Sequence, residues 1–152
     1  MEFRNEMQKN VYIMVASWFE PELQSGAIQR YEDQPAFFAR GGSAGIRISI
    51  LPYGDDEAVI NVLATVVKGA SLTPELMGFL LTTNRDSCWF GAFGFDGKSD
   101  TVTFEHSIVG STCDRKELQT SMVAVLGAAD KYDDMIVAKF GGKSLRARES
   151  GQ

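Results

Sequence analysis

His106 is the only histidine of the chain and the first candidate for chemistry. It lies in an alternating apolar stretch, residues 102–108, which would place it on one face of a strand with apolar neighbours. A catalytic or metal-binding histidine needs a base, a nucleophile or further ligands, and no such partner follows at a recognisable spacing. We therefore expect a hydrogen-bonded residue of the core or of an interface. The alternative is a small enzyme or ligand-binding protein centred on His106 and Cys88.

The two cysteines, Cys88 and Cys113, are too few and too far apart for a disulfide framework or a CxxC motif. We expect two free thiols in a reducing compartment. A redox pair is the alternative, because both residues would lie near the same edge of a sheet.

Two further patterns resemble sites. Residues 91–97 are rich in glycine, but phosphate loops lead into a helix N-terminus and this stretch leads into a strand. Asp130, Asp133 and Asp134 supply fewer oxygens than a hard cation prefers, and neighbouring acids on a helix are typical of a solvated face. We expect no catalytic residue, no metal and no cofactor.

Composition limits the classes of partner. The chain has 152 residues, a net charge of -5 and a pI near 4.9, which disfavour non-specific binding to nucleic acid or anionic membrane. The apolar run 11–19 is too short to span a bilayer and resembles no signal peptide, so we expect a soluble, cytosolic protein. Residues 1–142 would form one domain, and residues 143–152, with Lys143, Arg146 and Arg148, a flexible, solvated tail.

The helices and strands that would position these residues are predicted from two different spacings of apolar residues. Apolar spacings of three and four predict helices over 5–19, from Thr73 to about Asn84, and from Asp114 to Gly141. In the first of these, Val11, Ile13 and Val15 also fit an alternating strand, which is the alternative. Period-two or β-branched runs predict strands over 36–39, 46–51, 58–67, 88–95 and 101–109. The order is helix, three strands, helix, two strands, helix. It predicts an α+β fold with a five-stranded antiparallel sheet and helices mainly on one face.

The predicted strands contain more aromatic and aliphatic side chains than one buried face of a sheet needs. Adjacent aromatics at 37–38 and 89–90 would load both faces of their strands, whereas the second face of such a sheet is normally polar. An apolar second face would mark a partner or dimer interface, and core burial alone is the competing explanation. The residues expected to line this surface are Phe37, Ile48, Trp89, Phe93 and Phe104.

The region from about Phe38 to Gly142 resembles the YbjN-like proteins, which are grouped with the type III secretion chaperones. The features that carry the resemblance are the helix ending at Asn84, the strand 90–93, the strand with His106-Ser107, and the motif 132–134. The resemblance implies a helix–sheet sandwich that often forms a homodimer and holds extended partner segments along apolar patches. It also implies a bacterial sensory-transduction regulator or peptide-binding domain, and brings no catalytic residues.

The sequence thus predicts a non-enzymatic module that binds a polypeptide partner through apolar surface and strand edges. A purely structural subunit, whose apolar face is consumed by dimerisation, is a further alternative.

Overall fold

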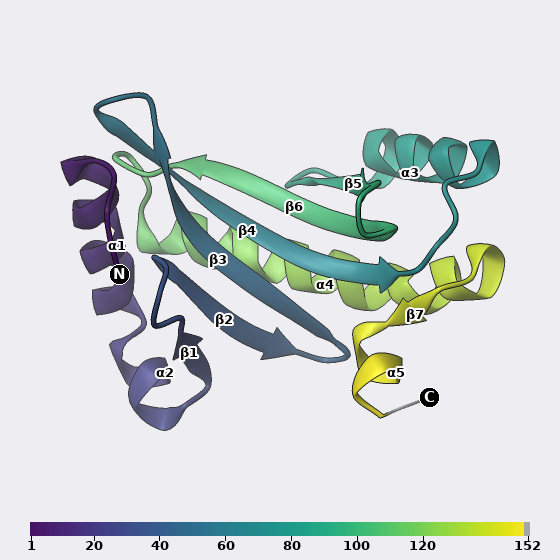
Figure 1. Cartoon of the computed structure of the whole chain (residues 1–152), viewed down its shortest axis with the longest axis horizontal. Coiled ribbons are helices and arrows are strands. Elements are labelled where there is room, and N and C mark those ends of the chain that lie inside the picture. Colours follow the sequence, from purple (N-terminus) through teal and green to yellow (C-terminus); the bar gives the residue numbers. More distant parts are fainter. Residues whose placement is uncertain (151–152) are drawn as a thin grey trace.

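The structure, a computed structural model, describes residues 1–150 and contains one antiparallel sheet with helices around it (Figure 1). The strand order is β1-β2-β3-β4-β6-β5, and β7 pairs with the end of β4. In chain order the elements are α1 (Glu6–Trp18), α2 (Glu20–Ser25), β1 (Ile28–Arg30), β2 (Ala36–Gly41), β3 (Ala44–Tyr53), β4 (Glu57–Lys68), α3 (Pro74–Ser87), β5 (Ala92–Asp96), β6 (Thr101–Val109), α4 (Arg115–Phe140), β7 (Lys143–Ser144) and α5 (Leu145–Glu149).

The core lies between one face of the sheet and helices α1 and α4. Alternate residues of β3, β4 and β6 point to this face, so that Ile48 pairs with Val62 and both are fully buried. Figure 1 shows α4 passing behind β3, β4 and β6, with α1 at the other end of the same layer. The alternation predicted for these three strands is therefore confirmed.

The helix boundaries follow from capping chemistry. Asp114 accepts a hydrogen bond from the Glu117 amide at 2.7 Å and begins α4, which ends at Gly141 with a φ of +79°. Thr73 caps α3 in the same way, with its hydroxyl 3.2 Å from the Leu76 amide. Both starts are the ones that the sequence predicts.

The sheet differs from the prediction because it has seven strands rather than five. β1 has three residues and β7 two, which is too short for a period-two pattern to be visible in the sequence. The pairing of β3 with β4 starts at Ile46 and Ala64, and β4 continues beyond it to Lys68. On this side the backbone of Val67 and Lys68 therefore pairs with β7 instead of β3. The residues expected as a flexible tail therefore form β7 and α5 in the structure, and only 151–152 lie outside the described residues.

The acidic cluster of α4 holds the turn between β2 and β3. The Ser43 amide and hydroxyl both donate to Asp130 at 2.7 Å, and the hydroxyl lies 2.9 Å from an oxygen of Asp133. The two donors from Ser43 lower the pKa of Asp130. Asp133 is buried, so the prediction of a solvated face is wrong for this residue and correct for Asp134.

No helix within residues 1–150 has both the length and the apolar character needed to cross a membrane.

Candidate functional site

Four of the five residues expected on a partner surface are buried within the chain. Phe37 and Ile48 have no exposed surface, and Phe93 and Phe104 retain 7% and 1%. Their positions in β2, β3, β5 and β6 direct them to the core face, where Phe37 stacks on Tyr12 with ring centroids 5.1 Å apart. In this arrangement they stabilise the core and do not meet a partner, which corrects the assignment made from the sequence.

Trp89 is the exception, with 92% of its surface exposed. It lies in the bend between α3 and β5, because β5 begins at Ala92 rather than at Cys88. Gly91 explains the later start. Its φ is +105°, and a Cβ there would lie 2.7 Å from the carbonyl oxygen of Glu105. Trp89 therefore does not share a strand face with Phe93, and it extends into solvent.

Asn84 fixes the start of β5 beside this bend. Its side-chain amide donates to the Phe93 carbonyl at 3.1 Å, and its carbonyl accepts from the Phe93 amide at 2.6 Å. This reciprocal pair resembles the pairing of a neighbouring strand at one position. The outer edge of β5 is therefore already occupied at Phe93, and the segment 88–91 is held between α3 and β6.

Three adjoining hollows, all lined by Phe90, form a groove between this bend and α4. Their volumes are about 250, 380 and 440 Å³. We call this surface the aromatic groove and define it by Cys88, Trp89, Phe90, His106, Lys116, Thr120, Val123, Ala124, Gly127, Ala128 and Lys131.

The floor of the aromatic groove is one face of α4 with small side chains. Ala124, Gly127 and Ala128 leave room along the helix, and Val123 is mostly exposed. The lining residues run from Lys116 to Lys131, a length of about 22 Å at 1.5 Å per residue. This surface is apolar along its floor. Lys131 lies near one end, and Lys116 lies near the other together with Asp114 and Glu117.

His106 lies beneath Phe90 at the wall of the groove. Its Nδ1 is 2.9 Å from the hydroxyl of the buried Ser121, and its ring centroid is 6.0 Å from that of Phe90. The expectation of a hydrogen-bonded histidine on an apolar strand face is confirmed. Within residues 1–150, no group of three or more histidine, cysteine or acidic side chains could hold a metal ion.

The two thiols are free and neither is activated. Burial raises the pKa of Cys88, and burial together with nearby Glu117 and Asp114 raises the pKa of Cys113 to about 11. A thiol with a raised pKa is protonated at neutral pH and is a poor nucleophile. These environments do not favour the alternative of an enzyme built on His106 and Cys88.

Comparison with protein families places this architecture. Residues 14–148 match the family TY-Chap1, described as T3SS (YopN, CesT) and YbjN peptide-binding chaperone 1. The chain belongs to this family. The match covers most of the chain, and it confirms the resemblance to YbjN-like proteins and type III secretion chaperones that the second half of the sequence shows.

Solved structures share the fold of this TY-Chap1 protein. One is described as the HopA1-SchA chaperone-effector complex, with a TM-score of 0.58 and 12% identity over 81% of this chain and 95% of the other. Another, the ExsC-ExsE complex, has a TM-score of 0.57 and 16% identity over 85% and 95%. No curated protein matches the chain. At these identities the structures establish a common fold, and the family match establishes a peptide-binding chaperone domain.

Proposed function

We propose that this TY-Chap1 domain holds a polypeptide segment in the aromatic groove and acts as a non-enzymatic chaperone-like module. The observation that carries the proposal is the pair Trp89 and Phe90, 92% and 50% exposed, beside the small-residue face of α4. Exposed aromatic side chains beside a hollow are typical anchors of protein interfaces. Family membership supplies the class of ligand.

The groove fits a short apolar segment better than a folded partner. Its length of about 22 Å corresponds to about six or seven residues of an extended chain. Because Asn84 already occupies the edge of β5 at Phe93, side chains rather than backbone pairing should contribute most of the affinity there. Lys131 would favour segments with an acidic residue near its end of the groove, whereas Lys116 lies beside Asp114 and Glu117 and gives the other end no such preference.

A selection of displayed random peptides on the full chain tests this function. We expect the selected peptides to contain two or more large apolar residues and to bind with a stoichiometry of one per chain, measured by calorimetry. Their binding site is mapped by NMR. Shifts confined to surfaces other than 88–91 and α4 would reject the groove, and failure to select any sequence would reject the function.

Replacing His106 by Ala separates this function from the enzymatic alternative. The change leaves the buried Ser121 hydroxyl without its partner, so the free energy of unfolding should fall by about 1–3 kcal/mol. Peptide binding of the folded fraction should persist with a modest change in affinity. A variant of unchanged stability that lost all function would instead favour a site centred on His106.

We also propose a homodimer formed through the outward face of α3. Leu72, Met77 and Leu81 are exposed on and before this helix, and Figure 1 shows α3 projecting beyond β5. Solution mass with and without Leu81→Glu tests the dimer, which the added charge should dissociate. If the monomeric variant still binds peptide, the alternative of a purely structural dimer subunit is rejected.

The proposed setting is the bacterial cytosol, where both thiols would remain reduced and a net charge of -5 would limit contact with nucleic acid and membrane. A role as a sensory-transduction regulator would operate through the polypeptide that the groove holds.

A further inference from the structure

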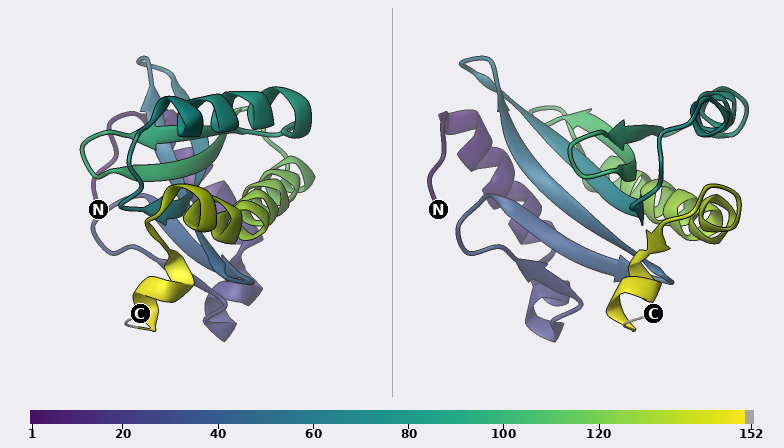
Figure 2. Two further views of the ribbon diagram at one scale, coloured as in Figure 1. Left: turned by 90° about the vertical axis from the view of Figure 1, so that its right-hand side faces the viewer. Right: turned by 45° about the vertical axis from the view of Figure 1, so that its right-hand side comes forward.

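The second face of the sheet is not free, because α5 lies across it. Side chains on this open face point away from α1 and α4, and they include Phe38, Arg40, Arg47, Leu63, Thr65, Thr103 and Glu105. Figure 2 shows α5 leaving β7 and folding back beside β3 and β4, on the side opposite α1. Residues 145–149, which the sequence predicts to belong to a flexible tail, therefore cover part of the open face.

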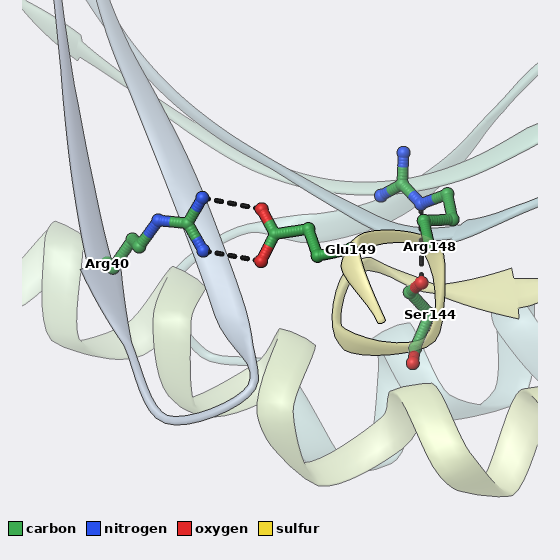
Figure 3. Close-up of polar contacts among 4 residues, drawn as sticks. All are labelled: Arg40, Ser144, Arg148 and Glu149. Carbon is green, nitrogen blue, oxygen red and sulfur yellow. Dashed lines mark hydrogen bonds and ion pairs between the residues drawn. The ribbon is translucent and has the colours of Figure 1, made fainter. Parts of the chain in front are cut away.

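Two contacts hold α5 in place. The guanidinium of Arg40 forms a two-point ion pair with Glu149, with one N–O distance of 2.7 Å (Figure 3). Leu145 packs over Gly45, where a Cβ would lie 3.1 Å from its Cδ2 and 2.8 Å from the ring of Phe38. An apolar anchor and a carboxylate one helical turn later are thus the features by which the open face recognises α5.

Hollows lie on both sides of this helix. One, of about 530 Å³, is lined by Arg148 together with Leu63, Thr103 and neighbouring residues of β4, β5 and β6. The other, of about 280 Å³, is lined by Gln29, Arg30, Tyr31 and Phe38. Both belong to the same face, so α5 interrupts a surface that would otherwise continue across β1 to β6.

The contacts of α5 are of a kind that can be exchanged. Both members of the Arg40–Glu149 pair are about half exposed, and exposed ion pairs contribute little net stability. The Arg148 Nη2 atom is buried without a hydrogen-bond partner among the described residues, while its Nε donates to the Ser144 carbonyl (Figure 3). A buried donor without a hydrogen bond costs free energy, so the association of α5 with the sheet is weaker than its buried area alone would suggest.

We propose that α5 is an intramolecular latch, and that the open face it covers is a second polypeptide-docking surface, distinct from the aromatic groove. Its occupant is a partner segment that carries an apolar residue followed one helical turn later by a carboxylate, the chemistry of Leu145 and Glu149. Arg40 and Arg47, each over an aromatic ring, give the β2–β3 part of this face a local positive charge on an acidic protein, while Glu105 lies farther away on β6. That charge selects an acidic segment over a basic one.

The test uses the full chain and a synthetic peptide of residues 143–150, which reproduces the latch. Three chains are compared by NMR: the natural chain, Glu149→Arg, and the swap Arg40→Glu with Glu149→Arg. Glu149→Arg should remove the proximity signal between Leu145 methyls and Gly45, and should bind the added peptide about three- to tenfold more tightly than the natural chain. The swap should restore the signal between the Leu145 methyls and Gly45, and it should not bind the peptide of residues 143–150.

Three controls make the result decisive. A peptide with Leu145→Ala and Glu149→Gln should not bind to Glu149→Arg, and Trp89→Ala in the aromatic groove should leave the latch unchanged. Gly45→Val, which fills the seat of Leu145, should release α5 without altering any charge. An internal signal that persists in Glu149→Arg, or equal binding of both peptides, would overturn the proposal while leaving the aromatic groove untouched.

Discussion

Replacing Trp89 by Ala is expected to remove most polypeptide binding and to leave the folded state nearly as stable as before. The indole is 92% exposed and lies in a bend, so its loss opens no cavity. Surface substitutions of this kind usually change the free energy of unfolding by less than about 0.5 kcal/mol. An aromatic anchor of an interface contributes about 2 kcal/mol or more, so the dissociation constant should rise by at least roughly thirtyfold.

Tyr53→Ala is the matched control for this prediction. Tyr53 is also a strongly exposed aromatic residue, but it ends β3 beside the turn that leads to β4, and no part of the aromatic groove includes it. Its replacement should change neither affinity nor stability. Calorimetric titration of both variants with one selected peptide checks the difference, and equal losses in the two would show that exposed aromatics act without a specific groove.

Replacing Phe37 by Ala should have the opposite effect and lower the free energy of unfolding by about 3–5 kcal/mol. Phe37 has no exposed surface and is enclosed by Tyr12 and Phe19, whose ring centroids lie 5.1 and 5.4 Å away. Removing the ring forfeits its burial and leaves a cavity that α1 and the sheet cannot fully close. Urea denaturation followed by circular dichroism measures the change.

The neighbouring residue supplies the control for this core prediction. Phe38 lies on the open face and is half-buried, so Phe38→Ala should cost clearly less stability than Phe37→Ala. The folded fraction of Phe37→Ala should bind a groove peptide as the natural chain does. A Phe37→Ala variant that is as stable as the natural chain but does not bind peptide would contradict this prediction. It would show that Phe37 contacts the partner, as the sequence analysis expects.

The local elements of this fold could be predicted because their causes are local. The run Ile46, Ile48 and Ile50 alternates with the period of a strand, and Asp114 and Thr73 are helix caps whose partners lie three residues ahead. The element order built from them also carries the family resemblance, which the match over residues 14–148 confirms. Local sequence patterns are therefore enough to predict the fold class and the three main helices, and the family resemblance adds the class of ligand.

Which apolar residues are available to a partner becomes visible only when the strands are packed together. Phe37 and Phe38 are adjacent aromatics with no polar neighbour between them, so period-two reasoning cannot tell which of them faces the core. The register of β2 on β3 settles this, because Phe37 pairs with the buried Ile48. Register is a long-range property and is not encoded in either residue alone.

Contacts between distant segments also determine the positions of Trp89 and α5. Trp89 leaves the strand because Gly91 approaches β6 at Glu105, a contact across 14 residues of chain. α5 lies on the open face because β4 extends past the end of β3 and can pair with β7. The aromatic groove and the latch both arise from contacts between distant segments, which is why only the folded chain shows them.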